Sequence, residues 1–282
     1  MRQYFLSNGS VRKLIDFGDS PIFESATTYT EITLWSKEPG KKPEVWDLTK
    51  AYEACSSLAE LLDRQGQGEA LFTPESFVLT WGDEARIKKR IEEVGKPLRD
   101  WDISIYRGIL TGLNEAFIID KKKYDELVAT DPRSAEILKP ILRGRDIKRY
   151  RAEWAGLYLI AMFPALHLDI DQYPAIRDYL KTFGKALEQS GERGSRKKTN
   201  NKWFEVQDTI AYWKEFEKEK IIYPNMTKYC PFVVEDANFL TNQKCFILTS
   251  EKESLRYLAA ILNSWVFDFA YRPSLFQNSR ND

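Results

Sequence analysis

The sequence predicts a mixed α/β (α+β) fold, and three observations support that prediction. Short segments rich in β-branched and aromatic residues recur along the chain, which is typical of strands. Residues 49–66 and 254–271 instead carry apolar residues at intervals of three and four, which is typical of helices. Apolar residues make up 43% and aromatic residues 13% of the 282 positions, so the chain can bury a core.

The first 48 residues predict the end of a larger sheet. Val11–Phe17 has the apolar character of a strand, and Tyr29–Trp35 alternates like a second one. Two strands cannot form an independent domain. We therefore expect 1–48 to be the C-terminal remnant of a domain, followed at 49–99 by a helical connector with a charged helix at Ala85–Val94.

Residues 100–282 change to short strands, glycine turns and basic loops, and they predict a separate domain. Ile103–Asp120 has the pattern of two strands around a glycine turn, and Ser134–Leu142 that of a short helix. Pro174 suits the first position of a helix, where its missing amide hydrogen costs nothing. Further strands are expected at 157–163, 220–223 and 245–248, and helices at 174–188 and 254–271.

Several classes of site are excluded by what the sequence lacks. Cys55, Cys230 and Cys245 have no Cys-x-x-Cys spacing, which argues against a disulfide framework and a thiolate zinc site. The single histidine, His167, cannot form a metal site alone, and no phosphate-binding glycine loop is present. We expect no metal. Without a long apolar run or a secretory signal, we expect a cytoplasmic protein with no membrane span.

Positive charge is concentrated in two loops, although the whole chain is neutral, with 42 basic and 42 acidic residues. Arginine and lysine neutralise phosphates, and asparagine can read base edges. The loops therefore predict nucleic-acid binding, with a solvated charged surface as the alternative. The candidate DNA contacts are Arg143, Arg145, Lys148, Arg149, Arg193, Arg196, Lys197, Lys198, Asn200, Asn201, Lys202 and Trp203, with Asn225 and Lys228 after a later strand.

Six blocks in order resemble a known family: Tyr106–Asp120, Ile137–Tyr150, Tyr173–Leu180, Trp203–Val206, Lys220–Met226 and Leu258–Trp265. Together they are similar to the TaqI-like C-terminal specificity domain. That domain is the target-recognition part of many type IIG restriction–modification enzymes and related adenine methyltransferases. Residues 14–32 resemble the last strands of a class I methyltransferase domain.

The resemblance implies that this chain recognises the DNA target, while a larger enzyme catalyses the reaction. In that family S-adenosylmethionine methylates an adenine, and an aromatic at the position of Phe23 stacks on the flipped base. A core aromatic beside a strand is the alternative for Phe23. The donor-binding glycine motif and the Asn/Asp-Pro-Pro-Tyr/Phe motif are absent from this sequence. We thus expect no cofactor and no catalytic residue here, and S-adenosylmethionine in the full-length parent.

Three functions are therefore compared. The first is sequence-specific recognition of double-stranded DNA for a type II (IIG-like) restriction–modification adenine-specific DNA methyltransferase. The alternative is a protein-interaction or specificity subunit that docks on a separate methyltransferase chain through the incomplete sheet at 11–35. The third, an active enzyme in its own right, needs a donor or metal site that the sequence does not reveal.

Overall fold

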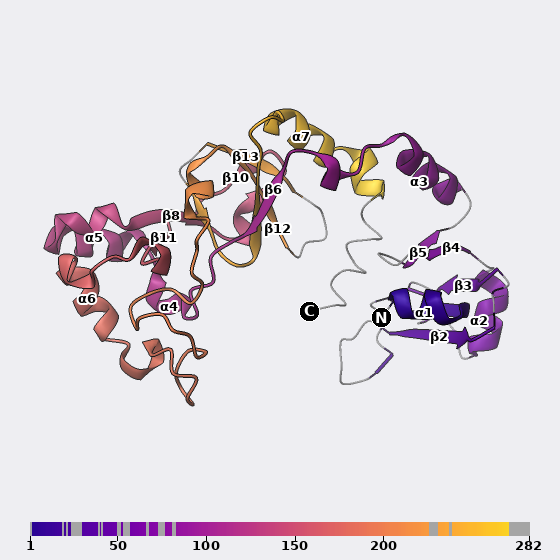
Figure 1. The fold of residues 1–282 in the computed structure, drawn as a ribbon, viewed down its shortest axis with the longest axis horizontal. Helices are drawn as coiled ribbons and strands as arrows, with labels where there is room; N and C mark the ends of the chain where they lie inside the picture. The colour runs from indigo at the N-terminus through magenta and orange to yellow at the C-terminus, as the bar shows by residue number, and fades with distance from the viewer. Residues whose placement is uncertain are drawn as a thin grey trace. The chain divides into compact units, whose positions relative to one another are not determined.

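The structure is a computed structural model of the chain, and it contains two compact units (Figure 1). The first unit includes the residues up to Pro97, and the second runs from Leu98 to Asp268. Small sheets alternate with helices in both, which confirms the predicted mixed α+β class. The structure describes residues 2–18, 20, 22–23, 30–38, 40, 42–49, 52, 57–65, 68–72, 77–80, 83–225, 231–236 and 239–270.

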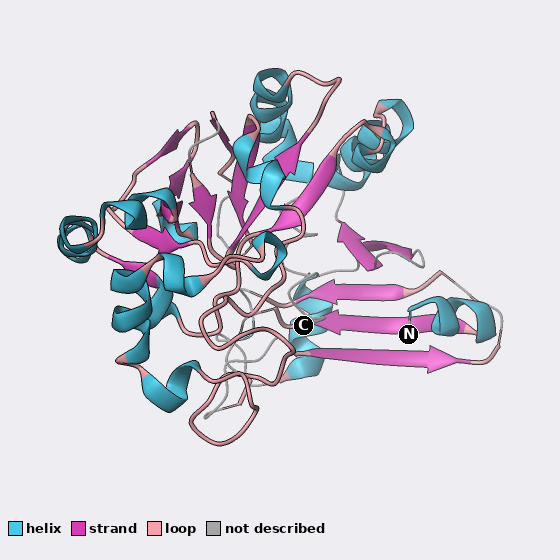
Figure 2. Cartoon of the chain, turned by 60° about the vertical axis from the view of Figure 1, so that its left-hand side comes forward, coloured by secondary structure: helices cyan, strands magenta, loops and turns pink. Residues whose placement is uncertain are grey.

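The first unit is built on a three-stranded sheet, drawn as three adjacent arrows in Figure 2. Its central strand pairs antiparallel with one neighbour and parallel with the other. Val11 and Leu14 of this strand, and Val45 of its parallel neighbour, are buried. Both strands predicted before residue 48, and the charged helix near 85–94, are confirmed. The elements are α1 (Arg2–Asn8), β1 (Ser10–Asp16), β2 (Glu31–Ser36), β3 (Glu44–Asp47), α2 (Leu58–Gln65), β4 (Glu69–Phe72), β5 (Phe77–Thr80) and α3 (Asp83–Val94).

The second unit holds two four-stranded sheets, in the orders β14-β8-β11-β7 and β13-β12-β15-β6. A large cluster of buried apolar side chains, from Ile109 to Ile247, includes members of both sheets. Its elements, with η for a 3-10 helix, are η2 (Leu98–Asp100), β6 (Ser104–Arg107), α4 (Asn114–Phe117), β7 (Ile118–Ile119), α5 (Lys121–Thr130), η3 (Pro132–Glu136), β8 (Leu138–Leu142), η4 (Gly144–Asp146), β9 (Ile147–Lys148), β10 (Arg151–Ala152), β11 (Tyr158–Ile160), η5 (Pro164–Leu166), η6 (Ile170–Gln172), α6 (Pro174–Lys181), η7 (Gly184–Leu187), η8 (Trp213–Glu217), β12 (Lys220–Pro224), β13 (Val233–Glu235), β14 (Leu240–Thr241), β15 (Cys245–Thr249) and α7 (Leu255–Leu262).

The strands predicted near 157–163, 220–223 and 245–248 are confirmed as β11, β12 and β15. Pro174 is the first residue of α6, as predicted, but the helix ends at Lys181 because the backbone turns to positive φ at Gly184. The helix predicted at 254–271 is interrupted: α7 ends at Leu262, and helical structure resumes at 265–270. At the break, the Asn263 side chain donates to the Phe232 carbonyl at 2.8 Å and accepts from the Phe232 amide at 3.0 Å.

Two element predictions in this unit were wrong, one of them only in part. The segment 103–120 contains two strands, as predicted, but they do not form a hairpin, because β6 pairs with β15 while β7 pairs with β11 in the other sheet. Between them the chain forms the short helix α4, which buries Ala116 and Phe117. Residues 134–142 are not a helix either. They continue from η3 into strand β8, where Pro140 lies opposite Tyr158 and removes a helical donor.

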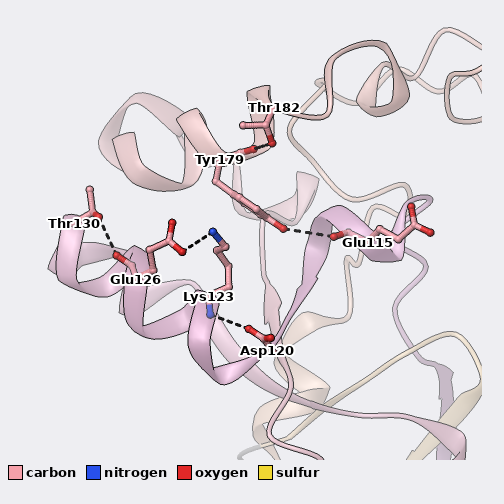
Figure 3. A network of polar contacts seen from close by, with 7 residues as sticks. All are labelled: Glu115, Asp120, Lys123, Glu126, Thr130, Tyr179 and Thr182. Carbon is pink, nitrogen blue, oxygen red and sulfur yellow. Dashed lines mark hydrogen bonds and ion pairs between the residues drawn. The ribbon is translucent and has the colours of Figure 1, made fainter.

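Polar contacts within α5 already pair Lys121 and Lys123, and one hydrogen bond links α6 to α4 (Figure 3). Asp120 caps α5 by accepting a hydrogen bond from the Lys123 amide at 2.8 Å. The Lys123 ammonium pairs with Glu126 at 2.6 Å, and Lys121 pairs with Asp125. The Tyr179 hydroxyl of α6 reaches the carbonyl of Glu115 at 3.5 Å.

Strand β12 carries a fully buried lysine. Lys220 has no exposed surface, and its Nζ donates to the carbonyls of Phe216 and Lys218 at 2.8 and 3.4 Å. Burial disfavours the ammonium form and lowers the pKa of Lys220 from 10.5 to about 8. The group therefore makes the stability of this unit depend on pH.

We expect Lys220→Met to flatten the pH dependence of unfolding between pH 8 and pH 10.5, the interval between the folded pKa of about 8 and the ordinary value of 10.5. In this interval the unfolded chain holds a proton that the folded chain has released, so stability rises with pH. The full difference corresponds to about 3 kcal/mol. Urea unfolding across this pH range measures it, and the exposed Lys122→Met is the matched control. An equal rise in wild type and Lys220→Met would contradict the assignment.

Candidate nucleic-acid interface

Both basic loops lie in the second unit. The first basic loop, Arg143–Arg149, follows β8 directly. The second basic loop, Arg193–Trp203, lies between η7 and η8, outside any regular strand or helix. Backbone position in such loops is set by side-chain hydrogen bonds and not by a ladder of strand pairs. Each loop contains charged side chains that face inward and others that remain exposed.

The first basic loop is shaped by a paired arginine and aspartate. Arg143 donates from its backbone amide and its guanidinium to the Asp146 carboxylate, at 2.8 to 2.9 Å. Asp146 is buried. Burial alone would raise the pKa of this carboxyl, but the hydrogen bonds from Arg143 outweigh it and hold the pKa below its ordinary value. Arg143 is thus largely engaged in holding the loop.

The remaining cations of the first basic loop are exposed: Arg145, Lys148 and Arg149. The Lys148 ammonium donates to the Arg145 backbone carbonyl at 2.9 Å, which holds the Lys148 side chain against the loop backbone. Neither Arg145 nor Arg149 forms an ion pair within the described part of the chain. Their charges are therefore available to a partner outside this loop.

The second basic loop is organised around a buried arginine, which corrects one sequence prediction. Arg196 is only 4% exposed. Its guanidinium donates to the carbonyls of Leu187, Thr111, Glu205 and Trp203, at 2.7 to 3.0 Å. It also lies 5.2 Å from the centre of the Phe117 ring. Because these donors are used inside the protein, we remove Arg196 from the candidate DNA contacts.

No carboxylate accepts from Arg196 in these contacts, and burial lowers its pKa from 12.5 to about 10. The side chain therefore stays charged at neutral pH and is stabilised by carbonyl dipoles. Hydrogen bonds to a charged group are stronger than those between neutral groups. A single side chain thus ties three points of the loop region to the segment at Thr111.

Amide side chains complete the inner face of the second basic loop. The Gln189 amide donates to the carbonyls of Lys202 and Glu205 at 2.9 and 3.1 Å. Asn201 likewise donates to the carbonyls of Val206 and Gln207, at 3.2 and 2.9 Å. Asn201 therefore holds the loop, and its Nδ2 is not free to read a base. Trp203 is half-buried against the core and meets Phe204 edge to face.

The outer face of the second basic loop carries the other candidates. They are exposed and form no ion pair with the described residues: Arg193, Lys197, Lys198, Asn200 and Lys202. By contrast, many cations elsewhere on this unit are paired with acids, including Arg133, Arg151, Arg177 and Lys218. The two loops are therefore rich in positive charge that the protein itself does not neutralise.

One short segment, Gly108–Gly112, contacts strand β14, which pairs with β8 before the first basic loop, and also contacts Arg196 of the second basic loop. At one end the Ile109 amide donates to the Thr241 carbonyl at 2.8 Å, in the strand that pairs with β8. At the other end the Thr111 carbonyl accepts from Arg196 at 2.9 Å. Gly108 has to be a glycine, because a Cβ there would lie 2.0 Å from the Asn242 carbonyl oxygen. Both loops are thus anchored to the same packed strand segments.

The remaining candidates lie apart or outside the described residues. Asn225 is exposed at the end of β12. Lys228 lies outside the described residues. Phe23 belongs to the first unit and is 56% exposed, so it is not a core aromatic within the described residues. Its stacking on a flipped base stays a prediction.

Gly18, the glycine that follows β1, has positive φ, and the space at its Cβ is filled by the Thr49 side chain at 2.5 Å. Among the described side chains, no group of three or more His, Cys, Asp or Glu residues is arranged to hold a metal ion. Across all the residues that the structure describes, no helix is long and apolar enough to cross a membrane.

Comparison with known proteins identifies a family for just over half of the chain. The model described as the TaqI-like C-terminal specificity domain matches residues 139–282. This confirms the resemblance seen in the sequence, although residues 100–138 lie outside the match. Both basic loops fall within it.

A curated relative is the type II methyltransferase M.PaeR7I of Pseudomonas aeruginosa, 24% identical over 271 residues. The alignment covers 89% of this chain and 44% of the relative, so the chain spans less than half of that protein's length. Two solved structures are also similar. They are the type IIL restriction–modification enzyme MmeI in complex with DNA (10% identity, TM-score 0.45, 92% of this chain and 32% of that one) and the type IIG restriction endonuclease BpuSI (13%, 0.38, 94% and 34%).

We expect Arg196→Gln to lower the free energy of unfolding of the second unit by about 2–4 kcal/mol, because buried carbonyls lose a charged donor. Urea unfolding of the full chain measures the change. Lys197→Gln, which removes an exposed charge from the next position, is the control and should change the value by less than about 0.5 kcal/mol. Equal effects of the two substitutions would contradict the buried role of Arg196.

Proposed function

The chain belongs to the family of TaqI-like C-terminal specificity domains, and we propose that its second unit recognises a specific sequence in double-stranded DNA. The observation that carries this proposal is the unneutralised positive charge on the outer faces of the two basic loops. The proposed contacts are Arg145, Lys148, Arg149, Arg193, Lys197, Lys198, Asn200 and Lys202, with Asn225 beside the first loop.

The chemistry of these residues suits the task. Exposed arginine and lysine side chains displace counterions from phosphates, which provides affinity without sequence information. Asn200 is exposed between them and can pair with an adenine edge in the major groove. The inward residues Arg143, Arg196 and Asn201 position the loops and do not contact DNA directly. A preset loop loses less conformational entropy on binding than a loose one.

In the larger enzyme we propose that this chain directs an adenine-specific DNA methyltransferase of the type II restriction–modification kind. S-adenosylmethionine would supply the methyl group there, held by residues other than the described ones of this chain. Phe23, exposed in the first unit, would stack on the extruded adenine. The cytoplasmic location expected from the sequence stays a prediction.

The proposed protein partner is the rest of the methyltransferase, in the same chain or in a separate one. Strand β2 lies at an edge of the described sheet, and its Ile32 and Leu34 are 47% and 53% exposed. Apolar side chains on an edge strand favour pairing with further structure. The chain aligns with 44% of its curated relative, and the proposed partner would correspond to the rest of that protein. Co-purification with a donor-binding methyltransferase chain, lost in Leu34→Glu, tests this contact.

We expect the chain to bind a labelled DNA duplex with an affinity that falls steeply between 50 and 200 mM salt, as counterion release requires. Replacing both Arg145 and Arg149 by alanine should reduce the slope of log affinity against log salt by about 1.8. The control pair Lys122→Ala and Lys181→Ala removes the same charge from helices α5 and α6. Absence of binding at 50 mM salt, or equal slopes for the two pairs, would refute the proposal.

A further inference from the structure

The turn between β14 and β15, Asn242–Lys244, lies against the first basic loop. The Lys244 carbonyl accepts a hydrogen bond from the Asn225 amide at 2.9 Å. On the other side, a Cβ added to Gly144 would lie 3.3 Å from the same carbonyl and 3.5 Å from Pro224. The turn, the first basic loop and the end of β12 therefore meet at one place.

All three backbone amides of this turn donate hydrogen bonds. The amides of Asn242 and Gln243 donate to the carbonyls of Leu142 and Ile109, at 3.2 and 2.9 Å. The Lys244 amide donates to the Asn242 side chain at 3.2 Å, and the Cys245 amide donates to the Asn242 carbonyl at 2.9 Å. The turn is thus held by both the β8 strand and the Gly108–Gly112 segment.

The side chains of Gln243 and Lys244 are not used in these contacts. Gln243 is partly exposed and Lys244 is exposed, and neither side chain forms a hydrogen bond or ion pair with the residues that the structure describes. The nearest acid of the first loop, Asp146, is buried and already paired with Arg143 at 2.8 Å. The turn therefore presents the Lys244 ammonium and the Gln243 side-chain amide on a backbone held by hydrogen bonds.

We propose that the Asn242–Lys244 turn is a third DNA-contacting element, in which Lys244 binds a phosphate and Gln243 reads a base edge. This inference rests on the proposed function and extends it to residues that lie in neither basic loop. The Lys244 Cβ lies 3.7 Å from the Cβ position of Gly144, the residue before Arg145, so Lys244 adds an exposed positive charge beside the first basic loop. A glutamine amide offers the donor and acceptor pair that matches adenine N7 and N6 in the major groove.

The test compares Lys244→Ala with Lys122→Ala, which removes an exposed charge from α5. Binding of the full chain to a labelled 30-base-pair duplex is measured over a series of salt concentrations. Lys244→Ala should reduce the slope of log affinity against log salt by about one, and Lys122→Ala should leave it unchanged. Equal slopes for the two variants, with wild type still binding, would overturn the phosphate contact while leaving the proposed function intact.

Base reading by Gln243 is tested with a pool of duplexes that carry a randomised centre. Wild type should enrich a defined motif, and Gln243→Ala should relax the preference at one base pair of that motif. An unchanged motif for Gln243→Ala would overturn its role in base reading. Failure of wild type to bind any duplex would instead refute the proposed function itself. Unchanged thermal unfolding of each variant confirms that the differences arise at the surface.

Discussion

The guanidinium of Arg196 is the interaction on which the arrangement of the second basic loop depends. It brings carbonyls from Leu187, Trp203 and Glu205 to one point, and the carbonyl of Thr111 to the same point from a distant part of the chain. A neutral side chain could not satisfy so many carbonyls at once. The loop has no regular secondary structure between η7 and η8, so this charge replaces the strand ladder that would otherwise fix it.

This arrangement divides the cations of the second unit into three kinds. Buried ones such as Arg196 hold the backbone, and paired ones such as Lys123 and Arg177 are neutralised by acids of the same helix or of a neighbouring turn. The third kind, represented by Arg149 and Lys198, is exposed without an acidic partner in the described residues. The first two kinds keep their charge within the protein. The third kind is concentrated in the loops and gives a neutral chain a local affinity for a polyanion.

The elements that could be predicted from the sequence are those with a strong periodic signal or a capping residue. Strands β12 and β15 are short apolar runs with turn residues around them, and α6 begins at the proline that suits its first position. The helix predicted at 134–142 was wrong because Pro140 and tertiary pairing with β11 override local spacing. The two strands predicted around Gly112 were assigned to each other, whereas each pairs with a strand far along the chain.

The candidate site could be located from the sequence, but the roles of its residues could not be separated. Arg196 and Lys197 are adjacent and chemically alike, yet one is buried and the other exposed. An irregular loop has no fixed period, so nothing in its composition says which side chains face inward. Lys244 was missed for a different reason. It is a single lysine next to apolar strand residues, and its proximity to Gly144 arises only from the pairing of β14 with β8.

The central claim is that exposed cations of both basic loops contact the same DNA duplex. Hydrogen–deuterium exchange of the full chain with and without a duplex tests it most directly. The account predicts slower exchange on DNA addition in peptides from both loops, 143–149 and 193–203, and unchanged exchange in α5 and α6. Protection confined to one loop, or protection of the helices with both loops unchanged, would contradict it.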